Sequence, residues 1–186
     1  MKKIITFIII AGFTLTSFAQ EKLKIDNSKS TIQWYGYYTF YFGGHEGTVD
    51  LKEGHFIKIN NKITGGEFTI DMISITGTDN GKIDTNSGLI KHLKNADFFD
   101  INKHPLAKLV ITKVAYRDST HARLEADLTI KGVTKSINFQ AEFNFEELTM
   151  TTKFKIDRTR WGITYNSKMK DGALSDAIGF EIKISL

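Results

Sequence analysis

The sequence predicts an all-β protein whose antiparallel strands close into an extended barrel of about eight strands, with one or two short helices. The first observation is an alternation of apolar and polar residues through most of the chain after residue 21, which is typical of strands with one buried face. The second is the length of one alternating stretch, residues 133–145, which would extend about 43 Å and suits a barrel better than a small sandwich. An eight-stranded antiparallel sheet removes its edges by closing, and its bore is wide enough for one ligand.

The first nineteen residues have the pattern of a secretory signal peptide. A positively charged start precedes an apolar stretch over residues 4–18, and small residues precede a cleavage position between Ala19 and Gln20. The alternative interpretation is a membrane anchor, but the stretch is shorter than the roughly 20 residues that a spanning helix needs. We therefore expect a signal peptide over residues 1–19, a mature domain over residues 20–186, and a periplasmic or secreted protein.

The expected strands share the alternating pattern and are separated by turn-forming pairs. They cover residues 31–35, 67–72, 107–112, 122–130, 133–145, 150–157 and 180–186. Turns are expected at Gly43-Gly44, Glu53-Gly54, Asn60-Asn61, Lys131-Gly132 and Glu146-Glu147, because glycine, asparagine and short polar pairs favour reversal of the chain.

One segment, residues 85–99, lacks the alternation and predicts a short helix. Its apolar residues recur at helical spacing: Leu89, Ile90, Leu93, Ala96 and Phe99. Thr85 or Ser87 is the expected N-cap. A second short irregular element is expected over residues 158–163.

Composition argues against several classes of function. The net charge of +4 falls to about +2 once Lys2 and Lys3 are removed with the signal peptide, and no run of basic residues is present to bind nucleic acid. The absence of cysteine excludes disulfides, thiol nucleophiles and zinc–thiolate sites. The five histidines show no metal-binding spacing, and no nucleophile motif is found. We therefore expect no metal, no cofactor and no enzymatic activity.

A cluster of seven aromatic residues over positions 34–42 exceeds what one half-buried strand needs. One interpretation is an ordinary core strand with its rim. The other is a cavity wall and entrance formed by Trp34, Tyr37, Phe40 and Phe42, facing residues such as Phe139 from another strand.

Four charged or titratable residues stand out near the predicted irregular elements. His92 lies on the predicted helix and is either a hydrogen-bonded structural residue or a group at the cavity mouth. Asp97 and Asp100 suit hydrogen bonding at a helix end better than acid–base catalysis. Arg158 is expected either to pair with Asp157 or another acid, or to meet an anionic head group.

Three motifs in order resemble those of the YceI-like family. They are HLKNADFFDINKHP (His92–Pro105), ADLTIKGVTKSINF (Ala126–Phe139) and FKIDRTRWGITY (Phe154–Tyr165). The resemblance implies a lipocalin-like barrel, export, binding of polyisoprenoids or other long amphiphiles in an elongated pore, and no established catalytic activity. The motif residues that it nominates for ligand contact are His92, Leu93, Asp97, Phe98, Phe99, Arg158 and Trp161. The stretch over residues 166–177 is polar, whereas many relatives have a more aromatic run there. This difference bears on the length of the ligand or the form of the entrance, and not on the fold.

The expected function is therefore to bind a long-chain amphiphile, as a carrier, store or scavenger without a stable membrane span. An unclosed sheet edge would permit a homodimer. An enzyme acting on an amphiphilic substrate is one alternative. An outer-membrane barrel is another, disfavoured by the mid-chain helix, the charged polar faces and the terminal Leu186.

Overall fold

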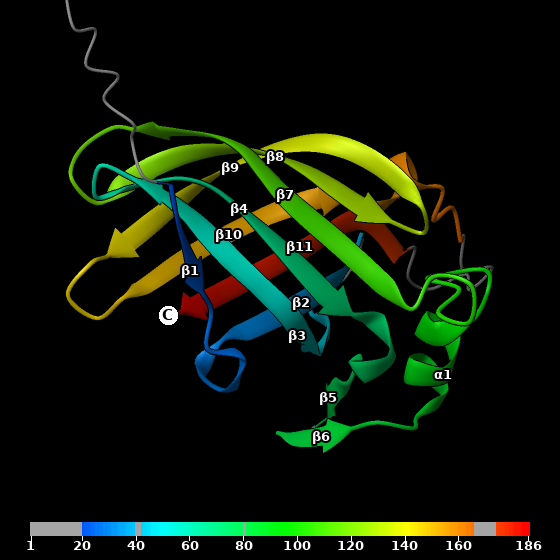
Figure 1. Ribbon diagram of the computed structural model, residues 1–186. Helices are drawn as coiled ribbons and strands as arrows, with labels where there is room; N and C mark the ends of the chain where they lie inside the picture. Colours follow the sequence, from blue (N-terminus) through cyan, green and yellow to red (C-terminus); the bar gives the residue numbers. More distant parts are fainter. Residues whose placement is uncertain (1–19, 40–41, 80, 166–173) are drawn as a thin grey trace, which may run out of the picture.

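The structure of the protein is a computed structural model that describes residues 20–39, 42–79, 81–165 and 174–186 (Figure 1). The predicted signal peptide over residues 1–19 lies outside the described residues, and so do its cleavage and Phe40. Among the described residues, no helix is long and apolar enough to cross a membrane.

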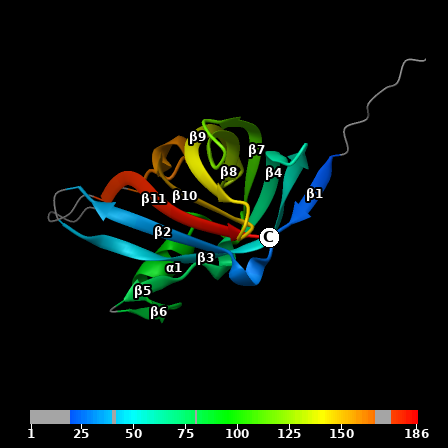
Figure 2. The ribbon, with the colours of Figure 1, turned by 90° about the vertical axis from the view of Figure 1, so that its left-hand side faces the viewer.

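Eight antiparallel strands close into a barrel, as predicted. In chain order they are β2 (Thr31–Tyr38), β3 (Gly44–Ile59), β4 (Lys62–Asp71), β7 (Leu106–Tyr116), β8 (His121–Ile130), β9 (Val133–Asn144), β10 (Thr149–Asp157) and β11 (Leu174–Ser185). Neighbours follow the order β2-β11-β10-β9-β8-β7-β4-β3, and pairing of β2 with β3 completes the circle. Figure 2 shows the strands wrapping around an enclosed interior, with the β2–β3 hairpin extending beyond it.

Shorter elements decorate the barrel. The strand β1 (Glu21–Lys24) pairs with β3. The strands β5 (Gly77–Asp79) and β6 (Lys82–Asp84) form a hairpin that pairs with β3 through β5 and lies near the helix α1 (Gly88–Lys94). Three 3-10 helices complete the chain: η1 (Asn27–Lys29), η2 (Met72–Ser74) and η3 (Arg158–Trp161). The strands β1, β5 and β6 are too short to show alternation, so the sequence did not predict them. Closure joins β2 to β3, but β9 and β10 pair only as far as Ala141 and Thr152. The remainder of these two strands and the short strands are the edges that a homodimer would use.

The turn predicted at Glu53-Gly54 is wrong, because β3 runs straight through it. The pairing of β3 with β4 shifts register between Leu51 and Glu53, which marks a bulge that bends a long strand around the barrel. Gly54 is needed there for space, since a Cβ at this position would lie 2.6 Å from a ring carbon of Phe68.

The helix α1 begins as predicted and ends earlier. The hydroxyl of Ser87 accepts a hydrogen bond from the backbone N–H of Ile90 at 3.3 Å, so Ser87 is the N-cap. The helix stops at Lys94 rather than near residue 99, because the chain then turns back: the N–H of Phe99 donates to the carbonyl of Leu93 at 3.1 Å. Asp100 adopts a left-handed conformation, with φ of 48°, which completes the turn.

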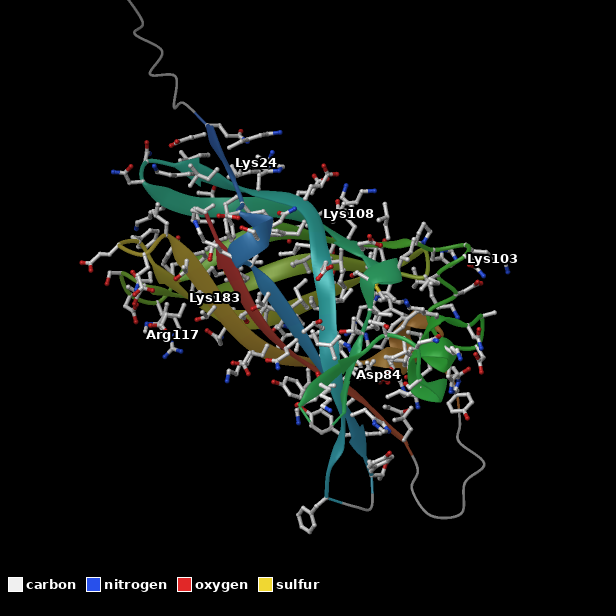
Figure 3. All side chains as sticks on the ribbon, turned by 90° about the horizontal axis from the view of Figure 1, so that it is seen from below. Lys24, Asp84, Lys103, Lys108, Arg117 and Lys183 are labelled. Carbon is white, nitrogen blue, oxygen red and sulfur yellow. The ribbon has the colours of Figure 1, made fainter. Side chains whose placement is uncertain are left out.

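The alternation places apolar side chains inside and charged ones outside. On β8, Leu124 and Ala126 are buried while Arg123 and Glu125 are exposed. Figure 3 shows charged side chains such as Lys108 and Lys183 pointing away from the barrel. The interior is therefore almost wholly apolar, and its composition is what makes a site there.

Candidate functional site

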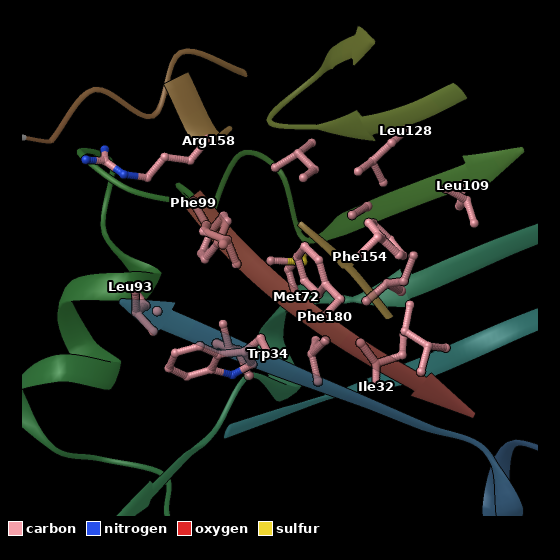
Figure 4. Close-up of a pocket in the computed structure, with 18 of the residues that line it drawn as sticks. Ile32, Trp34, Met72, Leu93, Phe99, Leu109, Leu128, Phe154, Arg158 and Phe180 are labelled. Atoms are coloured by element: carbon pink, nitrogen blue, oxygen red, sulfur yellow. The ribbon is translucent and has the colours of Figure 1, made fainter. Parts of the chain in front are cut away.

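The barrel encloses an apolar cavity of about 300 Å³. All eight barrel strands contribute inward-facing side chains to its wall, and α1, η2 and η3 contribute at one end. Figure 4 shows Arg158 and Leu93 toward that end and Ile32 and Leu109 toward the other, with Phe154 and Phe180 between them.

Alternate residues of neighbouring strands build the wall. Trp34 on β2 stands opposite Phe180 on β11, which in turn stands opposite Phe154 on β10. Phe154 stacks on Phe139 of β9 with ring centroids 4.6 Å apart. The indole N–H of Trp34 donates to the carbonyl of Thr76 at 2.9 Å, so the largest side chain on the wall offers the cavity a purely apolar surface.

The end near α1 is lined by apolar side chains and carries a histidine. Leu93, Phe98 and Phe99 are buried and face the cavity. His92 lies beside them, with its Nε2 3.0 Å from a carboxylate oxygen of Asp97 and its ring edge-on to Tyr165 at 4.2 Å between centroids. His92 is therefore both hydrogen-bonded and placed on the cavity wall, which joins the two interpretations offered for it.

Arg158 is buried at the same end and is held by protein groups. Its Nε donates to the carbonyl of Ser175 at 3.2 Å, its Nη1 to the carbonyl of Ile163 at 2.6 Å, and its Nη2 to the carboxylate of Asp176 at 2.9 Å. Of the predicted partners, the acid is thus Asp176 rather than Asp157. The guanidinium anchors the chain on both sides of residues 166–173 to the mouth of the cavity.

Asp157 instead caps η3, the element that carries Arg158. Its carboxylate accepts hydrogen bonds from the hydroxyl and the backbone N–H of Thr159 at 2.6 and 2.9 Å. These bonds, the hydroxyl first, lower the pKa of Asp157 below its ordinary value, because they stabilise the charged form. The cap fixes the point at which β10 turns inward to present Arg158.

A tyrosine–histidine pair that sequence reasoning missed also lines the cavity. The hydroxyl of Tyr38 lies 2.7 Å from Nε2 of His45 across the β2–β3 hairpin, and both residues face the cavity. The parity of β2 was the available signal, since Tyr38 shares the face of Ile32 and Trp34. His45 could be found only from the register of β2 against β3, in which it stands opposite Gly36.

The structure brings seven of the predicted site residues to the cavity and leaves others outside it. The wall includes Trp34, His92, Leu93, Phe98, Phe99, Phe139 and Arg158. Tyr37 lies on the outer face of β2 under the ammonium group of Lys155, 4.4 Å from its ring centre, because its parity is opposite to that of Trp34. Phe42 is fully exposed at the hairpin.

Two further predicted residues lie next to the wall. Asp97 is exposed and reaches the cavity only through its contact with His92. Trp161 is buried, but it turns away from the cavity and donates its indole N–H to the carbonyl of Leu128 at 3.0 Å. Trp161 therefore packs η3 against β8 and does not form part of the cavity surface. Among the described residues, no three histidine, aspartate or glutamate side chains gather to hold a metal ion.

The family is decided by the match of the YceI-like domain to residues 23–186. The chain belongs to the YceI-like family. A UPF0312 protein of Pseudomonas putida strain W619 is 29% identical over 141 residues, which is 76% of this chain and 69% of that protein. A UPF0312 protein of Vibrio parahaemolyticus is 31% identical over 111 residues, 54% of this chain and 59% of that protein.

Solved structures share the YceI-like barrel at low sequence identity. Burkholderia cenocepacia BcnA superimposes with a TM-score of 0.66 at 17% identity, over 86% of this chain and 98% of that chain. A polyisoprenoid-binding domain from Saccharophagus degradans gives 0.58 at 10% identity, over 90% and 97%. The YceI protein of Campylobacter jejuni gives 0.53 at 21% identity, over 98% and 96%. These likenesses establish the fold.

Proposed function

We propose that this YceI-like chain binds a long-chain amphiphile, an isoprenoid or a lipid of similar shape, inside the barrel and serves as a carrier, store or scavenger. The observation that carries the proposal is the enclosed apolar cavity, whose charged and titratable side chains gather at one end. Sites that bind apolar ligands typically combine such a lining with few polar groups. The polyisoprenoid-binding domain of Saccharophagus degradans, which shares the fold, supports this ligand class.

The energetics favour a long chain over a short one. Each methylene group moved from water into an apolar site contributes about 0.8 kcal/mol, so ten carbons contribute about 8 kcal/mol. That gain equals micromolar affinity before the cost of association, which is at least about 4 kcal/mol. A ligand of about fifteen carbons or more is therefore expected for useful affinity.

The polar groups suggest how the ligand is oriented. Arg158, His92 and the Tyr38–His45 pair all face the same end of the cavity. A polar head group there has hydrogen-bonding partners and access to water, whereas the deeper wall offers it almost none. The tail is therefore expected inside and the head at the α1 end.

The decisive experiment is native mass spectrometry of protein purified from its own host. We expect a co-purified apolar molecule, and its loss on changing Ala107 to Phe, because Ala107 on β7 faces the cavity and the added ring fills it. Ala115→Phe is the matched control, since Ala115 lies on the same strand and is exposed. Absence of any bound molecule, together with no binding of added long-chain isoprenoids, would refute the proposal.

Binding rather than catalysis is proposed for this site. Among the described residues, the hydrogen-bond partner of the His92 side chain is Asp97, and no serine or threonine hydroxyl bonds to it as a nucleophile would. If the alternative of an enzyme acting on amphiphiles were correct, single replacement of His92, Asp97 or Arg158 would abolish turnover and spare binding. Screening the purified protein for turnover of bound amphiphiles tests this alternative.

Export is the remaining part of the proposal. Cleavage between Ala19 and Gln20 predicts an intact mass that begins at Gln20, measured on protein recovered from the periplasmic or culture fraction. Retention of residues 1–19 in that protein, or recovery only from the cytoplasm, would overturn the proposed location.

A further inference from the structure

A second apolar pocket lies at the opposite end of the barrel from α1. Its volume is about 290 Å³, and its lining includes Leu23, Phe56, Ile63, Phe143 and Leu186. These residues belong to β1, the β3–β4 hairpin, β9 and the C-terminus. They are gathered at the end where β1 and the C-terminus lie in Figure 1, away from α1.

One side chain, Met150, lines both this far pocket and the main cavity. Met150 is buried and pairs with Ile184 on one side and Phe143 on the other. Within β10, Thr152 on its mouth side faces only the main cavity, and Thr149 before it faces only the far pocket. The two hollows therefore adjoin at Met150, which belongs to the wall of both.

Methionine is suited to a position between two pockets, because its side chain can change conformation when a ligand presses on it. Its unbranched side chain has three rotatable bonds and adapts its shape to neighbours, whereas a β-branched residue on a strand is fixed at χ1. The ring of Phe56 packs edge-on to that of Phe143 at 6.1 Å between centroids, so the far pocket keeps aromatic walls of its own when Met150 moves.

The depth of the main cavity sets a length for its ligand. Met150 and Arg158 are eight residues apart along β10 and the start of η3, which is about 26 Å of strand and about 20 Å along the axis of a barrel with strands tilted by about 40°. An extended chain advances about 1.2 Å per bond, so roughly sixteen bonds fill this depth. That corresponds to about four isoprene units.

We propose that Met150 determines the chain length this barrel accepts, by separating a main cavity for about four isoprene units from a far pocket that receives the end of a longer chain. The proposal rests on the proposed function, since it concerns the same bore. A chain of about four units ends at Met150. A longer chain displaces the thioether and places its last units against Phe56 and Phe143.

The test is a chain-length series of all-trans isoprenoid alcohols with fifteen, twenty and thirty carbons, competed against a fluorescent apolar probe. We expect affinity of the unchanged protein to rise up to twenty carbons and then level off. Met150→Ala is expected to raise the affinity for the thirty-carbon alcohol to roughly tenfold above that for the twenty-carbon one, because more of the chain becomes buried. Isoleucine suits a strand and has a stiffer side chain. Met150→Ile is therefore expected to lower the affinity for the thirty-carbon alcohol roughly tenfold and to leave the affinity for the twenty-carbon alcohol unchanged.

Met72→Ala is the matched control. Met72 is also a buried methionine, but it lines only the main cavity, so its truncation enlarges the site without joining the two compartments. The proposal would be overturned if the dependence of affinity on chain length were unchanged in both Met150 variants. It would also be overturned if Met72→Ala gained the same affinity for the thirty-carbon alcohol. Neither result would refute binding of the amphiphile. If Met150→Ala does not fold, the Met150→Ile profile alone decides. Failure of the unchanged protein to bind any alcohol of the series would refute the proposed function instead, and the role of Met150 with it.

Discussion

Replacing Arg158 by alanine should destabilise the protein by about 3 kcal/mol. The side chain is 4% exposed and donates to two backbone carbonyls, those of Ser175 and Ile163, and to the carboxylate of Asp176. Hydrogen bonds from a charged group contribute about 1.5–3 kcal/mol each. Asp176 is 64% exposed, so it regains water when the arginine is removed, and its share is at most about 1 kcal/mol. The two carbonyls therefore carry most of the loss.

Urea unfolding checks this value. With a slope of about 2 kcal/mol/M, the midpoint of Arg158→Ala should fall by about 1.5 M, whereas Asp176→Asn should move it by less than about 0.5 M. Arg160→Ala is the matched control, because Arg160 lies two residues away on η3 and is exposed, and its loss should cost little. A midpoint for Asp176→Asn as low as that for Arg158→Ala would show that the ion pair dominates, and would refute the reasoning.

Three further changes test other parts of the structure. Trp161→Phe removes the indole N–H from its buried carbonyl partner and should cost about 1–3 kcal/mol in urea unfolding, while probe affinity stays within twofold; a large loss of affinity would place this residue on the cavity wall after all. Gly47→Ala should unfold or strongly destabilise the protein, because a Cβ would overlap the facing backbone, whereas Gly88→Ala meets nothing within 4 Å and should be neutral or stabilising. The pKa of Asp26 is lowered to about 2 from 3.8, first by the hydroxyl of Ser28. The stabilisation that the charged carboxylate provides is therefore full above about pH 4 and is lost as pH falls through about 2. Asp26→Asn should flatten the dependence of the unfolding free energy on pH across that window, and an unchanged slope would contradict the assignment.

Period-two alternation predicted the barrel because it is a direct consequence of strand geometry. Each inward residue of β8 and β9 follows from parity alone, and so does the position of Phe139 on the cavity wall. Parity would also have selected Tyr38 over Tyr37. The prediction used aromatic character in place of parity at that point, and it therefore assigned to the cavity a ring that packs outside under a lysine.

The remaining features depend on register and on irregular backbone, which alternation does not encode. The contact between Tyr38 and His45 requires knowing how β2 pairs with β3. Trp161 and Arg158 belong to the same short element η3, but Trp161 is its last residue and donates its indole N–H to the carbonyl of Leu128, while Arg158 faces the cavity. A shared motif therefore does not imply a shared cavity. The partner of Arg158 lies across residues 166–173, and no local spacing indicates Asp176.

The distribution of polar groups bears on which end of the barrel a ligand uses. In the proposed function, a head group that entered past Phe56 and Phe143 would have to traverse the aromatic end and the length of the bore. Carrying a polar group through such a region without partners costs about 2–7 kcal/mol. The α1 end offers His92 and the Tyr38–His45 pair instead, so entry tail-first at that end avoids the cost. A ligand arriving this way meets Met150 last, which is why a single side chain at the far end can set the length of chain that fits.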